Sequence, residues 1–414
     1  MSILKGLRVL DMTAITAGGR TTQILADYGA DVIKIESPTR PDPFRHWSNV
    51  TGEVGSGDLS SPPFRVVGRN KRGIAIDLKD ERGVEVMRRL VETADLVVEN
   101  FRRGVMERLG IGFEQLRQWH PAIALVSISS QGDSGPERDN VSFGGTLEAL
   151  SGLMSVTGYG PAQPLWTTSK VNYPDQVVAL LGPGLALWTV LQCRATGRGM
   201  HIDLSQRELS TSLLGDLIAE SSISGHPARA HANTGAEFVT ACCPCAGDDE
   251  WLVITLRSAA EAKALSTATG VNVGYTQGSQ EERQRCAENV ARAVSAWSSA
   301  RDKGTAMREL QQAGVPAAAV LRAWELSGEE EQRGESFHVP VPTEDGEEMQ
   351  VSWPFEMHGQ DQPRIIRRAP HLGEHTAAVM DELGYSHDAI DALRRAGVIA
   401  ASDFVAADSG EVSR

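Results

Sequence analysis

The first 36 residues contain two strands separated by a helix, and this order restricts the chain to folds built on a parallel sheet. Residues 7–12 (LRVLDM) and 31–36 (DVIKIE) are short apolar runs typical of strands. Residues 18–28 between them have helical spacing of apolar side chains, and Gly29 is suited to end that helix. A strand, a helix and a strand within about 30 residues form a βαβ unit, whose two strands run parallel.

The same alternation continues as far as residue 129. Further strands are predicted at residues 70–78, 96–99 and 121–129, with an amphipathic helix at 80–93. The N-terminal part is therefore predicted to be an α/β domain. In such sheets ligands bind beyond the carboxyl ends of the strands, so the residues that follow each strand are the first candidates for a site.

The turn after the first strand does not carry a dinucleotide fingerprint. Glu36 ends the second strand, where a ribose-binding acid would lie in a nicotinamide enzyme, but the turn Ala14–Gly19 lacks G-x-G-x-x-G. A dehydrogenase is therefore disfavoured. The helix start that follows this turn can still bind phosphate through its free N–H groups.

Aromatic and basic residues follow the strand at 96–99. Asn100, Phe101 and Arg103 allow two interpretations: Phe101 belongs to the core and the arginines are solvated, or together they bind an adenine ring and its phosphates. Trp47 lies in the long loop 37–63, which is either anchored on the core by this side chain or functional.

A long apolar stretch follows a single carboxylate. Residues 177–193 are almost wholly apolar, and a helix that is apolar on all sides is predicted to be buried. Asp175 stands just before this stretch, after Pro174, where an aspartate is commonly a cap or a first-turn carboxylate. Residues 194–205 then form a glycine-rich turn that leads into an alternating strand.

Charge and cysteine content exclude several classes of function. The formal net charge of −14 disfavours nucleic acid or an anionic membrane as a main partner, although a local basic pocket can still hold a small anion. The N-terminus lacks a signal-peptide pattern, so a soluble cytoplasmic protein is expected. Cys242 and Cys245 form one C-x₂-C pair with no second pair, which favours a small-residue turn before a strand over a zinc site; no metal is predicted.

Several motifs in a fixed order resemble one enzyme family. They include LKGLRVLD, LADYGADVIKIE, NKRGIAIDL, ADLVVENFRRG, YPD before the apolar stretch, AGVPAAAV and APHLGEHT. Together they resemble the family III CoA-transferases (CaiB/BaiF family, formyl-CoA transferase-like). The resemblance implies a large Rossmann-like domain built from both chain ends, here 1–224 and 327–414, a small domain at 225–326, and an interlocked homodimer.

The resemblance also assigns roles to single residues. Asp175 matches the family's nucleophile, and Trp47 matches by position a tryptophan that gates the acid pocket. CoA contacts are expected from nine residues: Thr16, Arg40, Asn70, Lys71, Arg72, Asn100, Phe101, Arg103 and Arg108. Thr16 replaces a glutamine, Ser37-Pro38 replaces an arginine for which Arg40 or Arg45 could substitute, and a four-glycine lid is absent. Oxalate is therefore not the expected acid.

The implied reaction transfers CoA from an acyl-CoA to a carboxylic acid. An aspartate that attacks the thioester forms a mixed anhydride and splits one difficult step into two. CoA then belongs to the substrate, and no permanently bound cofactor is expected. Two alternatives remain: an acyl-CoA racemase, disfavoured because residues 136–140 (PERDN) contain no histidine, and a non-catalytic subunit of a heteromeric transferase. The donor and the acceptor are not specified by the sequence.

Overall fold

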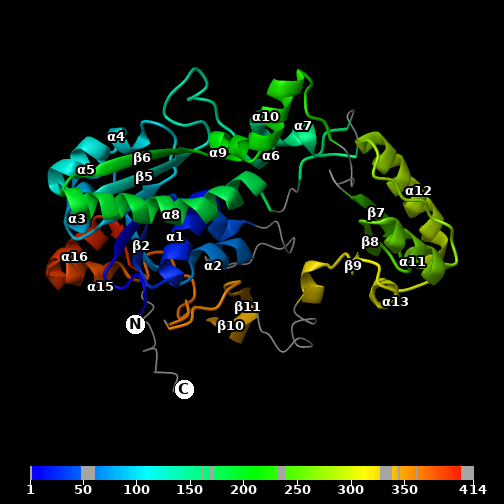
Figure 1. Cartoon of the computed structure of the whole chain (residues 1–414). Helices are drawn as coiled ribbons and strands as arrows, with labels where there is room; N and C mark the ends of the chain where they lie inside the picture. Colours follow the sequence, from blue (N-terminus) through cyan, green and yellow to red (C-terminus); the bar gives the residue numbers. More distant parts are fainter. Residues whose placement is uncertain are drawn as a thin grey trace. The chain divides into compact units, whose positions relative to one another are not determined.

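The structure is a computed structural model and describes residues 2–47, 61–159, 163–167, 171–230, 238–326, 338–343, 346–359 and 361–401 (Figure 1). It contains two compact units. One comprises Met1–Ser151, Thr168–Leu214 and Phe337–Arg414, and the other Gly152–Thr167 and Gly215–Ser336. The larger unit thus draws on both ends of the chain. The domain limits at 224 and 327 stay a prediction of domain architecture.

The larger unit is built on a seven-stranded sheet in the order β12-β3-β2-β1-β4-β5-β6. Six strands run parallel, and the short β12 (Ile399–Ala400) pairs antiparallel with β3. The parallel strands are β1 (Arg8–Met12), β2 (Asp31–Glu36), β3 (Arg72–Ile76), β4 (Leu96–Glu99), β5 (Ala124–Ser129) and β6 (Met200–Ser205). The predicted α/β class with a parallel sheet is confirmed.

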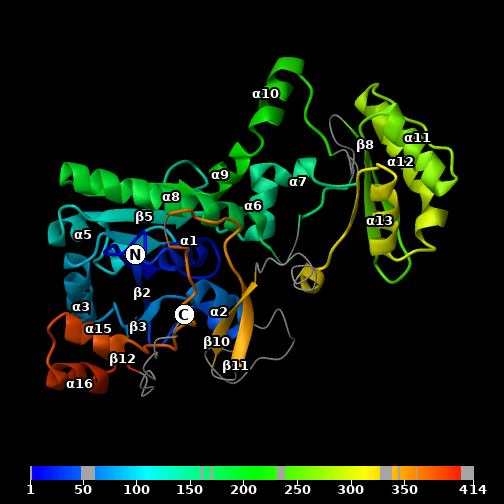
Figure 2. The same cartoon turned by 60° about the horizontal axis from the view of Figure 1, so that its bottom comes forward.

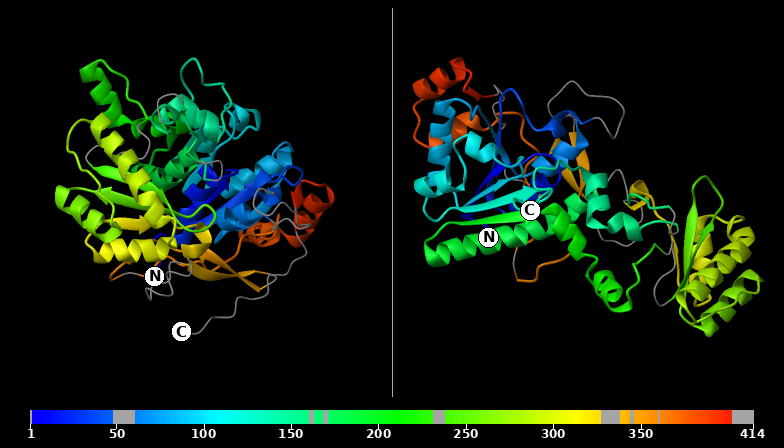
Figure 3. Two further views of the ribbon diagram at one scale, coloured as in Figure 1. Left: turned by 90° about the vertical axis from the view of Figure 1, so that its right-hand side faces the viewer. Right: turned by 90° about the horizontal axis from the view of Figure 1, so that it is seen from above.

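Helices cover both faces of this sheet. On one face, apolar residues of α1 (Ala17–Asp27) and α8 (Tyr173–Thr196) pack against Val9, Val98 and Val126. On the other, α3 (Glu81–Glu92), α5 (Phe113–Trp119), α15 (Thr376–Glu382) and α16 (His387–Arg395) bury Leu10, Ile74 and Leu125. Figures 1 and 3 show α8 running along the sheet with α1 beside it. Two buried layers of side chains therefore hold the sheet between helices.

Helices α1 and α8 pack closely because of one glycine. A Cβ atom on Gly182 would lie 2.6 Å from the hydroxyl oxygen of Thr21, which is too close for any other residue at this position without a shift. The next residue, Pro183, lies inside α8 and removes one backbone donor from the helix. The G-P-G sequence within the apolar stretch is thus a packing element of the α1–α8 contact.

Helix α8 is not buried on all sides in the single chain, contrary to the prediction. Leu180, Trp188 and Leu191 are 75%, 49% and 63% exposed, and their spacing places them along one side of the helix. By length and composition alone α8 could cross a membrane, but 44% of its most apolar window is buried inside the structure, and the core helix of a soluble protein passes the same test. The prediction of burial on all sides is wrong because only one side of α8 packs against α1 and the sheet.

Two predicted helices are interrupted in the structure. The helix expected at 141–158 consists of α6 (Gly144–Ser151) and α7 (Leu153–Val156), separated by Gly152 with a φ of +90°. The helix expected at 207–223 consists of α9 (Gln206–Ser212) and α10 (Gly215–Ser224). Short elements occupy the described parts of the loop 37–63 and its continuation: η1 (Pro43–His46) and α2 (Pro62–Gly68). Residues 48–60 of this loop lie outside the described residues.

The chain end adds a hairpin to the larger unit, β10 (His338–Thr343) with β11 (Gly346–Val351), drawn in orange in Figure 2. The smaller unit has an antiparallel sheet of β7 (Val239–Pro244), β8 (Trp251–Leu256) and β9 (Ala317–Ala319). The predicted helices appear there as α11 (Ala259–Thr269), α12 (Gln280–Ser298) and α13 (Lys303–Gln312). The turn predicted around Cys242 is wrong, because this residue lies within β7; its thiol is free.

Candidate active site

The sheet reverses its order between β1 and β4, and the turns that follow these two strands are joined there. The chain passes from β1 through α1 to β2 on one side, whereas β4 lies on the other side of β1. Ligands of open α/β sheets bind at such a switch point, outside the carboxyl ends of the strands. The side chain of Asn100, after β4, bonds both the N–H and the C=O of Ala14, each at 2.8 Å. The amide of Asn100 thus holds the β1–α1 turn, and its expected contact with CoA stays a prediction.

That turn contains a strained residue. Ile15 has a φ of +62°, in the left-handed region that a β-branched side chain rarely adopts. Such a conformation costs about 1–3 kcal/mol and persists only where its surroundings enforce it. The N–H of Ile15 donates to Asp42 at 3.2 Å, and its side chain packs against the cluster that includes Phe44 and Phe64. The next residue, Thr16, is the N-cap of α1 but makes no side-chain cap bond.

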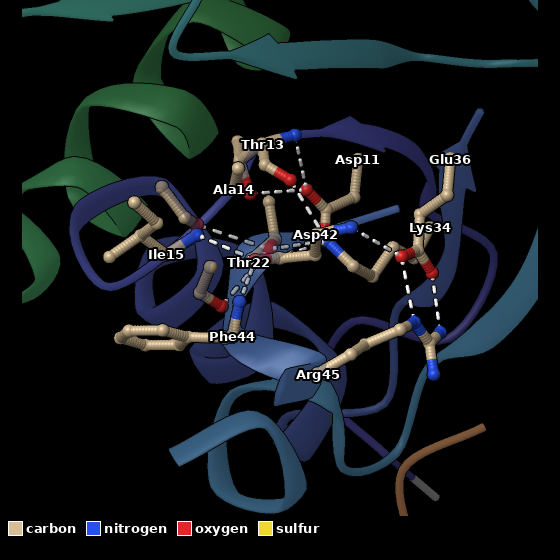
Figure 4. A network of polar contacts seen from close by, with 12 residues as sticks. Asp11, Thr13, Ala14, Ile15, Thr22, Lys34, Glu36, Asp42, Phe44 and Arg45 are labelled. Carbon is tan, nitrogen blue, oxygen red and sulfur yellow. Dashed lines mark hydrogen bonds and ion pairs between the residues drawn. The ribbon is translucent and has the colours of Figure 1, made fainter. Parts of the chain in front are cut away.

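A buried ion pair between Lys34 and Asp42 contacts the β1–α1 turn (Figure 4). Lys34 donates to the carbonyl of Thr13 at 2.8 Å and to Asp42 at 2.9 Å, and both side chains of the Lys34–Asp42 pair are 1% exposed. Burial alone would lower the pKa of Lys34, but Asp42, Asp11 and Glu36 raise it above its ordinary value. Lys34 therefore carries its charge in the interior, and that charge depends on these carboxylates.

Of the two arginines considered as substitute ligands, Arg45 is not accessible. Arg45 has no exposed surface and binds Glu36 through two nitrogens. Its guanidinium lies 4.0 Å from the centre of the Phe64 ring. Glu36 is consequently paired rather than open to a ribose. Arg40, by contrast, is exposed.

Residues 70–72 make contacts within the protein, and their expected contacts with CoA stay a prediction. Lys71 has no exposed surface, and its ammonium donates to Asp11 at 2.7 Å. Asn70 donates to Asp27 at 2.6 Å and accepts from the N–H of Ile366 at 2.8 Å. Arg72 begins β3, at the amino edge of the sheet, and pairs there with Asp31 and Glu382. The resemblance matched the segment before β3, whereas open space lies after this strand.

A cavity of about 440 Å³ is located beyond the carboxyl end of β3. It is lined by apolar and charged side chains from the β3–α3 connection and from the end of α4 (Val105–Arg108): Leu78, Lys79, Glu81, Val84, Arg108, Leu109 and Gly110. Arg108 was predicted as a CoA contact, and the structure brings Lys79 to the same cavity. Lys79 was missed, although its position just after a predicted parallel strand is the signal that would have found it.

The other two predicted residues after β4 differ in their surroundings. Phe101 is half-buried and packs against the core. Arg103 is exposed and pairs with Asp133 at 2.5 Å. Beside them, Glu99 ends β4 almost fully buried, and burial raises its pKa to about 7 despite a hydrogen bond from the N–H of Phe101. The carboxyl end of β4 thus carries a carboxyl group that titrates near neutral pH.

Asp175 lies in the first turn of α8 but does not cap it. The N-cap is Asn172, in the left-handed region with a φ of +50°, and Asp175 accepts a hydrogen bond from the side chain of Gln206 at 2.7 Å. Burial raises the pKa of Asp175 to about 6, and the bond from Gln206 opposes this shift. A first-turn carboxylate was one prediction for this residue. Its environment adds that the charged form is partly desolvated and that, among the contacts of the described residues, it is held by the amide of Gln206.

The start of α8 and the start of α1 are at the same edge of the sheet. Both helices lead from the carboxyl end of one parallel strand to the next, so they run in the same direction. Gly182 touches Thr21, and at 1.5 Å per residue Asp175 lies about 10 Å and Thr16 about 8 Å back along their helices. Asp175 is therefore on the same side of the sheet as the strained turn.

Trp47 follows η1 near this turn. Its ring packs edge-on against Phe44, with ring centres 5.5 Å apart, and 37% of the residue is exposed. Phe44 belongs to the cluster against which Ile15 packs. Trp47 is thus anchored on the core and also open to solvent, which agrees with both interpretations of this residue.

Comparison with known proteins decides the family. The model described as CoA-transferase family III matches residues 4–376. The chain belongs to CoA-transferase family III. A succinate–glutarate CoA-transferase of Agrobacterium fabrum is 30% identical over 395 residues, which cover 92% of this chain and 95% of the relative. A crystal structure of a CaiB/BaiF family protein from Brucella suis matches with a TM-score of 0.81 and 26% identity, covering 92% and 99% of the two chains.

A longer relative also matches this family III chain. The probable CoA-transferase Rv1866 of Mycobacterium tuberculosis is 33% identical over 327 residues, or 77% of this chain, and the match spans 40% of the relative's length. The predicted family is confirmed, and the protein is an enzyme of the CoA-transferase type. Family III enzymes take an acyl-CoA and a carboxylate as substrates, so CoA enters as part of a substrate.

Proposed function

We propose that this enzyme transfers CoA from an acyl-CoA donor to a carboxylic acid through covalent intermediates on Asp175. The observation that carries the proposal is the state of this carboxylate: it lies in the first turn of α8, does not cap the helix, and has its pKa raised to about 6 by burial. A desolvated carboxylate that is still ionised at neutral pH is a suitable nucleophile. Family membership supports the same role.

The reaction requires four displacements, and each conserves atoms and charge. A carboxylate oxygen of Asp175 attacks the thioester carbonyl, the C–S bond breaks, and CoA leaves as a thiolate with a mixed anhydride on the enzyme. The thiolate attacks the aspartyl carbonyl, which releases the donor acid and leaves an aspartyl thioester. The acceptor carboxylate then displaces the thiolate, and the thiolate takes the acceptor's acyl group to restore Asp175. Gln206 is placed to orient the attacking oxygen.

We assign the nucleotide end of CoA to the cavity beyond β3. Lys79 and Arg108 supply positive charge for phosphates, and Leu78, Val84 and Leu109 supply apolar surface for a ring. Phe101 and Arg103, after β4, remain further candidates for contacts. The thioester end is then expected at the switch point, near Thr16, and the acid near Trp47.

The interlocked homodimer is part of the same proposal. The exposed side of α8, with Leu180, Trp188 and Leu191, is an apolar stripe of the kind that protein interfaces cover. A second copy of the chain is its expected partner, and a cytoplasmic location is expected with it. Sedimentation of the purified protein tests the dimer, because a Leu180→Glu variant should shift it toward the monomer.

A panel of donors and acids tests the activity. The name of the Agrobacterium fabrum relative supports dicarboxylic acids as the first candidates, so succinyl-CoA should be offered with glutarate and other acids, followed by acetyl-CoA and formyl-CoA. Mass spectrometry should detect a new acyl-CoA only when donor and acid are both present. Oxalate should be a poor acceptor because Thr16 and Ser37-Pro38 depart from the oxalate-type pattern. Exchange of an α-hydrogen without any acid would instead indicate a racemase.

A further inference from the structure

We propose that Asp42 is a positioning residue that sets the β1–α1 turn and the Trp47 segment in register with each other. The inference rests on the proposed function, since it concerns where the thioester and the acid are held. Asp42 is 4% exposed and lies between β2 and η1. No substrate atom is assigned to it.

One carboxylate joins three parts of the chain. Oxygen Oδ1 of Asp42 accepts from the N–H of Ile15 at 3.2 Å and from the N–H of Phe44 at 2.9 Å, and Oδ2 accepts from Lys34 at 2.9 Å. The N–H of Asp42 itself donates to Glu36 at 3.0 Å. The β1–α1 turn, the β2 strand and η1 therefore share a single buried group, as Figure 4 shows.

The turn depends on such external bonds because its own conformation is unfavourable. Ile15 does not adopt a positive φ without support, and Gly would be the usual residue there. The two residues before Ile15 are also hydrogen-bonded. The backbone of Thr13 bonds the side chains of Asp11 and Lys34, and the N–H of Ala14 donates to Asn100. These bonds hold the turn so that α1 and its first-turn N–H groups start at a defined point at the carboxyl edge.

The same carboxylate determines where Trp47 stands. Asp42 caps η1 through the N–H of Phe44, and the ring of Phe44 contacts both the cluster that holds Ile15 and the edge of Trp47. A loss of the Asp42 bonds would release the turn and η1 together. The acid and the acyl carbonyl would then lose their mutual alignment, on which transfer between them depends.

The test compares two buried ion pairs in the larger unit. Asp42→Ala with Lys34→Met removes the pair under the turn without leaving an unpaired buried charge. Asp27→Ala with Arg69→Met is the matched control, because that pair is also buried, at 0% and 3% exposure, but lies at the far end of α1 from the turn. Both variants should lose comparable thermal stability. Asp42→Ser with Lys34→Met replaces the first variant if that double change does not fold, because the shorter side chain cannot reach both Ile15 and Phe44.

The expected result is a difference between these variants in three measurements. The Asp42 variant should lose at least about tenfold in kcat and raise the KM of the acid, while CoA itself still binds, because the group lost acts on alignment. Hydrogen exchange of the amides of residues 13–16 should quicken in this variant and not in the control. Adding Ile15→Gly, which favours the required backbone conformation, should recover at least about threefold of the lost kcat.

The outcomes separate the inference from the proposed function. Equal kcat in the Asp42 variant and its control, with unchanged exchange at residues 13–16, would overturn the positioning role while the transferase activity stands. A wild-type protein that transfers no CoA with any pair in the panel would overturn the proposed function, and the exchange measurement would still decide whether Asp42 holds the turn. Loss of kcat without rescue by Ile15→Gly would also contradict the role given to the strained residue.

Discussion

Two helices of this enzyme carry an aspartate at or near their start whose pKa is shifted in opposite directions: Asp302 is the N-cap of α13, and Asp175 lies in the first turn of α8. At α13, Asp302 accepts a hydrogen bond from the N–H of Thr305 at 2.9 Å, and hydrogen bonds from Thr305 lower its pKa. At α8, Asp175 accepts no bond from the helix backbone among the described contacts, and burial raises its pKa to about 6. Thr305 of α13 stabilises the charge of Asp302, and in the described part of the chain Gln206 stabilises that of Asp175. The comparison shows that an aspartate at the N-cap position is held by its own helix, whereas Asp175, inside the first turn, is bound by a side chain from another element.

Replacement of each aspartate by asparagine should give the largest contrast. Asp175→Asn should fold, bind CoA and lose at least about a thousandfold in turnover, because an amide cannot form the anhydride. Asp302→Asn should keep its turnover, because asparagine caps about as well as aspartate. Steady-state kinetics on both proteins measures the contrast. Near wild-type turnover in Asp175→Asn would falsify the nucleophile assignment.

Covalent trapping sharpens the same contrast at the level of the intermediate. Wild-type enzyme incubated with its acyl-CoA and quenched with hydroxylamine should carry a hydroxamate on Asp175, and none on Asp302. The reason is that only an activated aspartyl carbonyl reacts with hydroxylamine. Peptide mass spectrometry locates the modification, and a label at another carboxylate would move the nucleophile there.

Arg108→Ala should show the reverse pattern from Asp175→Asn. Loss of a charge-assisted bond should weaken CoA by about 1.5–3 kcal/mol, or roughly 10- to 150-fold, while the chemical step at saturation is kept. Calorimetry with CoA measures the affinity. Arg117→Ala is the control, since Arg117 is exposed and pairs only with Glu114 in α5 among the described contacts. Unchanged affinity in Arg108→Ala would remove the cavity beyond β3 from the CoA site.

The dependence of kcat/KM on pH should report the ionisation of Asp175. Attack requires the carboxylate form, so kcat/KM should rise with pH through the pKa of Asp175, about 6, and should be about tenfold below its plateau at pH 5. Gln206→Leu removes a hydrogen bond that favours the charged form, so the acidic limb should move to higher pH. A limb that stays in place would mean that another group, with Glu99 the first candidate, controls the profile.

The smallest expected effect is on stability. The pKa of Asp175 is higher in the folded state than its ordinary value of 3.8, so ionisation opposes folding as pH rises from 3.8 through about 6, and fully above that range. Asp175→Asn should therefore raise the free energy of unfolding at pH 8 by about 1–2 kcal/mol, after allowance for partial exposure. The gain should vanish near pH 3, and Asp302→Asn should show no gain. Chemical denaturation at both pH values measures it.

The sequence predicted the strands of the sheet closely, but it did not predict the contacts that the candidate site residues make within the protein. Strands at 31–36 and 96–99 agree with β2 and β4 to the residue, because their apolar runs are short and bounded by polar turns. The helix at 207–223 was predicted as continuous, but it breaks at Leu213 and Leu214, directly before Gly215, which begins α10. Lys71 was expected at CoA and is buried in an ion pair with Asp11, a partner sixty residues away in the chain. Pairing over such a distance leaves no local pattern.

The sequence by itself determined the parallel order of the strands, the family, and the place of Asp175 at the start of an apolar helix. These follow from local periodicity and from motifs that are contiguous along the chain. Only the tertiary structure decided that Asn172 rather than Asp175 is the N-cap of α8 and that Asp175 accepts from Gln206. It also decided that Asn100 holds Ala14 and that Ile15 is kept in a strained conformation by Asp42. Each of these contacts joins segments that approach one another only when the sheet has formed. Burial and partner geometry, which set pKa and strain, exist only in that assembled state.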